Sequence, residues 1–233
     1  PIYKSHNDWN KLIHSLEVRC GLEEDEFSKA QILNDIATTY EDNLNDPSKA
    51  LETYGRMLML QPTEANIQQK IESLAAQTGE LQVWADLYNK VIEDNLIEDY
   101  QDKRVIMISL AKLVAERLGD HDKARGLCEK MLEEAPEEME AYDILEWPYA
   151  EKHDYDDMLK LWTKKADILQ DQDEKIALLL RLATLQEEIA HDEAGACATY
   201  QQILEIDQNA AGAAPSLERL LCKTANYEAL ANF

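Results

Sequence analysis

The chain has 233 residues and a net charge of −24, because 47 acidic residues outnumber 23 basic ones. A surface this acidic repels the phosphates of nucleic acids and the headgroups of anionic membranes, which excludes both as partners. Hydrophobic residues make up 45% of the chain, enough to bury a core, and only 7 Gly and 6 Pro residues interrupt it. This composition predicts an all-α protein.

The excess of negative charge leaves two interpretations open. Acidic side chains keep a protein soluble whatever it binds, and they also attract a basic partner. No run of 18 apolar residues occurs, so we expect no insertion into a membrane. The four cysteines form no CxxC pair. We interpret Cys128 and Cys197, which lie on apolar faces of repeat helices, as small buried side chains in a reducing compartment, which favours the cytoplasm. The four cysteines are Cys20, Cys128, Cys197 and Cys222.

The first predicted helices lie on either side of an acidic turn. One covers residues 6–20 and the next residues 27–44, each with apolar residues at helical spacing. The tripeptide at 45–47 ends the second helix and starts a third, and Pro47 stands at the first helical position, where its missing N–H costs nothing. A further hairpin follows, with Gly79 as the C-cap of its first helix.

The remaining predicted helices repeat this arrangement. Trp147-Pro148 falls inside one of them, where a proline is expected to kink or break the helix. The predicted helices cover residues 102–118, 120–135, 141–151, 154–169, 174–191, 192–206 and 210–223, with a last one from residue 227.

A skeleton of small, aromatic and aliphatic residues recurs along the chain. The first copy is Ile36-Ala37, Tyr40, Ala50, Tyr54, Met57 and Pro62; the second is Leu110-Ala111, Val114, Ala124, Cys128, Met131 and Pro136; the third is Leu182-Ala183, Gln186, Ala196, Tyr200, Ile203 and Gln208. A period of this length with small residues at matching places predicts stacked helical hairpins.

A second pattern alternates with the first. An aromatic residue or Met stands three positions before Leu in Trp9-Leu12, Trp84-Leu87, Met158-Leu161 and Tyr227-Leu230. The repeating unit is therefore a double hairpin. We expect one solenoid over residues 1–233, with units at about 7–80, 81–154 and 155–225 and a partial helix at 226–233. We also expect the chain to be a piece of a longer array, and its apolar ends to associate end to end.

The skeleton resembles the tetratricopeptide repeat. The Ile36-Ala37 pair, Tyr40, Ala50 and Tyr54 fall where that family has its Leu-Gly, Tyr, Ala and aromatic positions, although the turn before Ala50 is one residue longer. The resemblance implies a right-handed α-solenoid superhelix whose first helices line a concave groove that binds a peptide or a partner helix. The paired spacing is similar to that of long repeat proteins of bacteria.

The resemblance also implies which residues line the groove. They are Gln31, Asn34, Thr38, Glu41 and Asp42 in the first unit; Val105, Ile108, Lys112, Ala115 and Glu116 in the second; and Ala177, Leu180, Thr184, Glu187 and Glu188 in the third. Members of the family that clamp a carboxylate use Lys, Arg and Asn there, whereas this groove is mainly acidic, which fits a basic or mixed ligand better. The alternative is that these are ordinary solvated helix positions.

No pattern of catalytic or metal-binding residues stands out. The five histidines are scattered and none pairs with another ligand at metal-binding spacing. The acidic turn at 154–157 lacks the glycine and the closing Glu of a calcium loop, so we interpret it as a helix cap. We expect no enzyme activity and no cofactor.

These observations predict a protein–protein interaction scaffold that binds a partner protein or peptide. Two other functions stay open, a structural spacer in a longer array and an accessory domain of a larger signalling or enzymatic protein. The tryptophans are expected to pack between hairpins, with Trp147 as the exception that a partner contacts.

Overall fold

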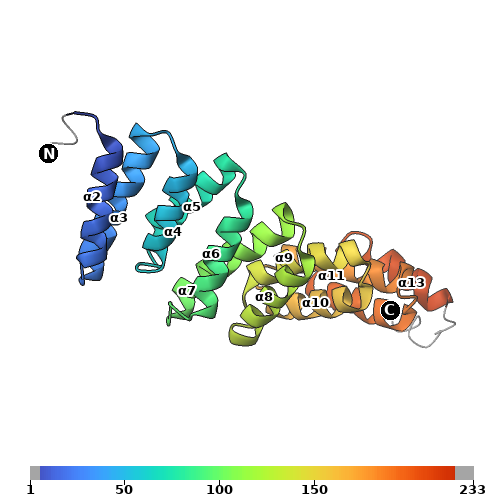
Figure 1. Ribbon diagram of the computed structural model, residues 1–233. Helices are drawn as coiled ribbons and strands as arrows, with labels where there is room; N and C mark the ends of the chain where they lie inside the picture. The colour runs from blue at the N-terminus through green and yellow to red at the C-terminus, as the bar shows by residue number, and fades with distance from the viewer. Residues whose placement is uncertain (1–5, 224–233) are drawn as a thin grey trace. The chain divides into compact units, whose positions relative to one another are not determined.

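The computed structural model describes residues 6–223, which form helices joined by short turns, with no strand among them (Figure 1). The predicted all-α fold is confirmed. The helices are α2 (Trp9–Leu22), α3 (Glu26–Thr38), η1 (Thr39–Asn43), α4 (Pro47–Leu58), α5 (Ala65–Thr78), α6 (Leu81–Glu93), α7 (Tyr100–Lys112), η2 (Leu113–Arg117), α8 (His121–Glu134), α9 (Met139–Lys152), α10 (Tyr155–Ile168), α11 (Gln172–Glu188), α12 (Glu193–Ile206) and α13 (Ala213–Lys223). The predicted helix from residue 227 lies outside the described residues.

The chain forms two compact units that divide between Lys123 and Ala124, inside α8. In the first unit each helix from α2 to α7 contacts the next, and in the second the same holds from α9 to α13. We call α3, α5, α7, α9, α11 and α13 the A helices, because each opens a hairpin, and the even-numbered helices the B helices. The stacked hairpins are thus confirmed within each unit, while the superhelical twist and the three double-hairpin boundaries stay predictions.

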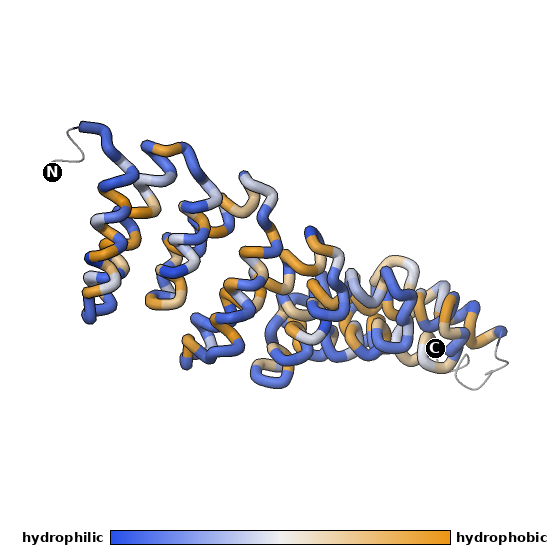
Figure 2. Tube along the Cα trace, in the orientation of Figure 1, coloured by the Kyte–Doolittle hydropathy of each residue, from blue (hydrophilic) through white to orange (hydrophobic). Residues whose placement is uncertain are grey.

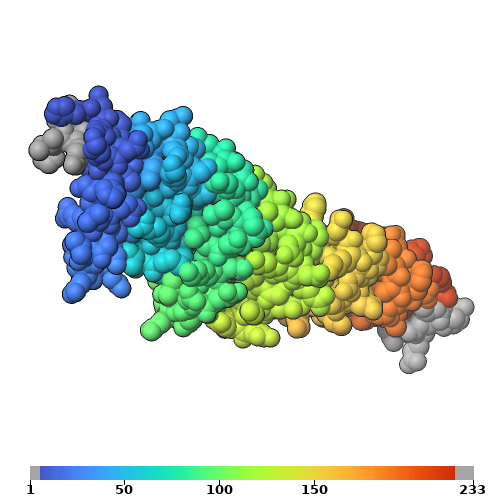
Figure 3. Space-filling view, in the orientation of Figure 1, coloured from blue at the N-terminus to red at the C-terminus, as the bar shows by residue number. Residues whose placement is uncertain are grey.

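The repeated alanines lie at the centre of the hairpins. Apolar and polar residues alternate along each helix with helical spacing, as Figure 2 shows. Side chains fill the spaces that the ribbons leave between α2–α3 and α4–α5 (Figure 3). Small side chains without exposed surface allow an A helix and its B helix to approach closely. The alanines of the skeleton that are fully buried are Ala37, Ala50, Ala111, Ala124, Ala183 and Ala196.

A widened turn follows each A helix that carries the skeleton. Helices α3 and α7 end in the π-helical turns η1 and η2, and an aspartate amide then donates to a carbonyl six residues back, at 2.8 to 2.9 Å. The aspartate side chain caps the next helix, and the residue before it has a φ between 51° and 68°. The three turns end at Asn45-Asp46, Gly119-Asp120 and His191-Asp192. The extra residue relative to the tetratricopeptide pattern is accommodated by this widening.

Helix α9 continues through Pro148 from Met139 to Lys152, so of the two expected effects of this proline, a kink or a break, the break does not occur. The fixed φ of proline suits a helix, and a single backbone hydrogen bond is lost. Trp147, directly before the proline, is 60% exposed, whereas Trp162 is only 8% exposed. The turn at 154–157 is a helix cap, because the Asp154 carboxylate accepts the Asp157 amide.

The four thiols differ in exposure, which predicts their order of reaction. Cys20 and Cys128 are buried, Cys197 is half-buried and Cys222 is exposed, and burial raises the pKa of Cys128 to about 12. Because the thiolate is the reactive form, we expect a disulfide reagent at pH 8 to modify Cys222 first and Cys128 only after unfolding. Counting modified thiols in the native protein and in urea measures this, and rapid reaction of Cys128 in the native protein would contradict it.

Candidate functional site

Hydrogen-bonded ion pairs connect successive A helices, and two of them use residues that were predicted to line the groove. Glu41 in η1 accepts from Lys70 in α5 at 2.7 Å. Glu187 in α11 accepts from both terminal nitrogens of Arg219 in α13, at 2.6 and 2.8 Å. These two glutamates occupy matching places in their repeats. Their charges are therefore partly neutralised within the chain and are less available to a ligand.

A second set of contacts between A helices involves glutamates that the sequence analysis did not select. Glu72 in α5 accepts from the Tyr88 hydroxyl at 3.0 Å and from the Ser109 hydroxyl of α7 at 2.8 Å. Glu146 in α9 stands 74 residues further on and accepts from Arg181 of α11 at 2.9 Å. The same repeat period that relates the alanines relates Glu72 to Glu146, and this is the sequence signal that could have identified them.

Glu146 is a half-buried charged centre. It also accepts from Lys165 of α10 at 2.9 Å, and Lys165 is mostly buried. Burial alone would raise the pKa of Glu146, but the hydrogen bonds from Lys165 and Arg181 outweigh burial and hold this pKa below its ordinary value of 4.5. A carboxylate with a lowered pKa stabilises the fold above its unfolded pKa and loses that contribution as the pH falls through its folded pKa.

We therefore expect the Glu146→Gln substitution to destabilise the protein by about 2 kcal/mol at pH 6, and by less at pH 3.5, where the carboxyl group of Glu146 in the unfolded wild-type chain is already largely protonated. Urea unfolding at the two pH values measures the difference. The control is Glu52→Gln, because Glu52 is exposed on α4. An equal loss of stability at both pH values would show that the charge of Glu146 does not contribute.

A hollow of about 430 Å³ opens between α3 and α5, and we call it the Phe27 hollow. Its floor is apolar, since Ala30, Met57 and Ile67 are buried, whereas the Phe27 side chain at its edge is 63% exposed. Its walls are polar. The polar residues that line it are Gln31, Asn34, Asp35, Gln61, Glu64 and Asn66.

These six polar side chains make no hydrogen bond or ion pair within residues 6–223. Four are carboxamides, which both donate and accept hydrogen bonds, and two are carboxylates, which only accept. The structure thus brings two predicted groove residues, Gln31 and Asn34, together with four polar residues that were not predicted. The hollow presents unpaired hydrogen-bonding groups beside an exposed aromatic ring.

A second hollow, of about 460 Å³, lies on α11 where it packs against α10, and we call it the Trp162 hollow. Three predicted groove residues line it, namely Leu180, Thr184 and Glu188. The other lining residues are Trp162, Arg181, Leu185 and Ile189. Most of these contribute apolar surface, so this hollow differs in character from the polar Phe27 hollow.

The Thr184 hydroxyl, which lies in the lining of the Trp162 hollow, donates to a backbone carbonyl of its own helix, and the Thr38 hydroxyl does the same in α3. The other predicted groove residues line neither of these two hollows. Ala115 is only 4% exposed, so the expectation that it faces a groove is wrong, because it is buried in η2. Six further predicted groove residues also lie outside both hollows. They are Asp42 and Glu116 in the two π turns, Val105, Ile108 and Lys112 on α7, and Ala177 on α11. Of these, Val105 is 49% exposed.

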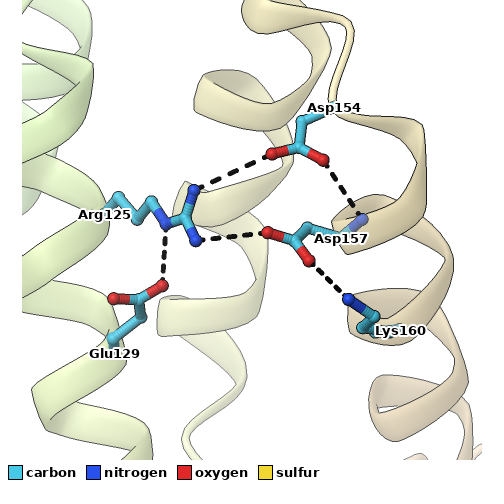
Figure 4. Close-up of polar contacts among 5 residues, drawn as sticks. All are labelled: Arg125, Glu129, Asp154, Asp157 and Lys160. Carbon is cyan, nitrogen blue, oxygen red and sulfur yellow. Dashed lines mark hydrogen bonds and ion pairs between the residues drawn. The ribbon is translucent and has the colours of Figure 1, made fainter.

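A charged cluster between the B helices α8 and α10 was not predicted (Figure 4). Arg125 donates to Glu129 at 2.8 Å and to Asp157 at 3.1 Å, and lies 3.8 Å from Asp154. Lys160 binds the second oxygen of Asp157 at 2.8 Å. Each of these five side chains has an oppositely charged partner in the cluster. The cluster therefore connects α8 to α10 and offers no unpaired charge to a ligand.

No protein-family model and no curated protein matches this chain. Among solved structures it resembles the crystal structure of MamA, with 22% identity over 75% of this chain and 94% of that one, at a TM-score of 0.43. It also resembles YrrB, a tetratricopeptide repeat protein with an unusual peptide-binding site, with 13% identity over 80% and 91% of the two chains and a TM-score of 0.45.

A tetratricopeptide repeat protein from Parabacteroides merdae is similar over 94% of both chains, with 15% identity and a TM-score of 0.39. Tetratricopeptide repeat proteins are thus among the solved structures that this chain resembles. Identities and TM-scores this low carry no information about what the chain binds.

Proposed function

We propose that this chain is a non-catalytic scaffold that binds a partner protein or peptide on its A helices, and that the bound segment carries Lys or Arg. The Phe27 hollow supports this proposal most directly. It combines an exposed aromatic ring with six polar side chains that have no partner in residues 6–223. The hollow is present without a ligand, and its polar side chains make no contact that stabilises the fold. Such a surface is better explained by binding a ligand than by a contribution to the chain's own stability.

The chemistry of the hollow favours an extended, basic segment. Carboxamides such as Asn34 and Gln31 can bind the N–H and C=O groups of a peptide backbone. The carboxylates of Asp35 and Glu64 attract Lys or Arg side chains, and the Phe27 ring can contact an aliphatic side chain or a cation. No group of three or more His, Cys, Asp or Glu residues that could hold a metal occurs within residues 6–223. We propose no catalytic role.

Affinity capture from the native lysate tests this function. The full chain is compared with the Phe27→Ser variant and with Val83→Ser as the control, because Val83 is an apolar residue that is 41% exposed on a B helix. Captures are run at about 0.05 M and 0.5 M salt, which screens exposed charges strongly. We expect one dominant partner at low salt, lost at high salt and with Phe27→Ser, and retained with Val83→Ser.

A structural spacer is the second candidate, and the ion pairs between A helices favour it. Glu41–Lys70 and Glu187–Arg219 hold neighbouring hairpins together through two residues that were predicted to contact a ligand. If nothing specific is captured at either salt concentration, the spacer function replaces the binding function.

End-to-end association of chains and a reducing compartment stay predictions. No helix within residues 6–223 is long and apolar enough to cross a membrane.

A further inference from the structure

The Trp162 hollow has an apolar lining that is open to solvent on one side. Leu180 and Leu185 of α11 are partly exposed, and Ile189 at the end of this helix is 47% exposed. The Trp162 ring is 8% exposed and closes the hollow from α10. A volume of about 460 Å³ is sufficient for one large side chain with part of its backbone.

Arg181 is held in a fixed position in the wall of this hollow. Its guanidinium carbon lies 4.3 Å from the centre of the Trp162 ring, and one of its nitrogens donates to Glu146 at 2.9 Å. Stacking on the ring and pairing with a carboxylate together restrict the side chain and neutralise its charge. The planar guanidinium group of Arg181 therefore forms part of the lining of the hollow and does not attract an acidic ligand.

The indole nitrogen of Trp162 is buried, and no acceptor for its hydrogen occurs within residues 6–223. Most buried Trp N–H groups have a hydrogen-bond partner, because an unpaired buried donor costs free energy. This nitrogen has less than 1 Å² of accessible surface, so it is not itself a contact for a ligand, but its hydrogen belongs to the ring that closes the hollow and reports on what binds there.

The charge at the rim is negative. Glu188 lines the hollow, is exposed, and makes no salt bridge within residues 6–223, although its charge also acts on Arg219. Its neighbour Glu187 is instead held by Arg219. The free carboxylate beside an apolar hollow, in a chain with a net charge of −24, is complementary to a cation that stands next to an apolar side chain.

We infer that the Trp162 hollow binds a bulky aliphatic side chain of a partner segment, and that a Lys or Arg within two positions of that side chain pairs with Glu188. This inference rests on the proposed scaffold function and adds the residue types that the compact unit containing α9 to α13 selects. It assigns different ligand groups to the two hollows, because the Phe27 hollow is suited to peptide backbone and the Trp162 hollow to one apolar side chain.

Selection of a random dodecapeptide phage library on the immobilised full chain tests the inference. The selected sequences are then synthesised, labelled and titrated by fluorescence anisotropy against wild-type chain, Ile189→Ser, Glu188→Lys and Val83→Ser. Val83 is the matched control, because it is an aliphatic residue of a B helix with 41% exposure, close to the 47% of Ile189.

We expect selected peptides with an aliphatic residue close to Lys or Arg, whose affinity falls about tenfold with Ile189→Ser and with Glu188→Lys and stays unchanged with Val83→Ser. We also expect the indole N–H resonance of Trp162, assigned with Trp162→Phe, to shift when the peptide binds. Peptides that bind Ile189→Ser as tightly as wild type, or an unshifted indole resonance, would overturn the inference.

The outcomes also separate this inference from the scaffold function. Peptides that lose affinity with Phe27→Ser, but not with Ile189→Ser or Glu188→Lys, would leave the scaffold function standing and remove the role of the Trp162 hollow. Failure to select any peptide on the wild-type chain would count against both.

Discussion

Replacing Leu58 with alanine is expected to lower the free energy of unfolding by about 3 kcal/mol. Leu58 lies in α4 and has no exposed surface, and α4 contacts both α3 and α5. The substitution removes apolar atoms from the centre of the first unit and leaves a cavity that the neighbouring helices fill only in part. Urea unfolding followed by circular dichroism at 222 nm measures the loss.

The control for this experiment is the same substitution at Leu22, which is 78% exposed at the end of α2. Because little apolar surface leaves water there, we expect Leu22→Ala to change the free energy of unfolding by less than about 0.5 kcal/mol. Equal effects of the two substitutions would mean that α4 is not packed between α3 and α5 as described.

The double substitution of Asp35 and Glu64 by lysine is expected to weaken the binding of a basic partner at least about tenfold. Both carboxylates line the Phe27 hollow and neither has a partner within residues 6–223. Reversing them replaces attraction of Lys or Arg by repulsion at the contact itself. The dissociation constant for the captured partner, measured by calorimetry at low salt, gives the result.

Long-range charge also changes in this variant, because two acid-to-lysine substitutions shift the net charge from −24 to −20. The control therefore reverses Glu93 and Asp94, which are exposed at the end of α6 and give the same net charge. We expect this control to weaken binding by less than about threefold at low salt. If both double variants weaken binding equally, the partner responds to overall charge and the Phe27 hollow is not its site.

The fold could be predicted in detail because its determinants are local and periodic. Ala37 and Ala50 recur at fixed distances along the sequence, and an aspartate caps the start of helices α3, α4, α7, α8, α10, α11 and α12. In α9 the sequence left open whether Pro148 kinks or breaks the helix, and the helix continues without a break. Pro148 and Tyr149 are both buried, and burial in tertiary structure overrides the local preference.

The site was harder to predict, because it depends on which side chains meet across two hairpins. Gln31 and Asn34 were predicted to line the groove and are exposed, but their neighbours Glu64 and Asn66 come from the next hairpin, whose distance the sequence does not specify. For the same reason, the engagement of Glu41 by Lys70 was not foreseen. Pairs between repeats require three-dimensional spacing, whereas pairs within one helix follow from its period.

The identical turns at Asn45-Asp46 and Gly119-Asp120 have a consequence for how the chain can be lengthened or shortened. In both, a residue of positive φ precedes an aspartate that caps the next helix. Joining Asn45 directly to Asp120 would therefore rebuild the same turn and remove one whole double hairpin. Duplication of a gene segment between these two points would add one in the same way. A deletion or duplication whose ends lie at these turns would therefore keep the positive-φ residue and the capping aspartate at the junction, while it removes or adds one double hairpin.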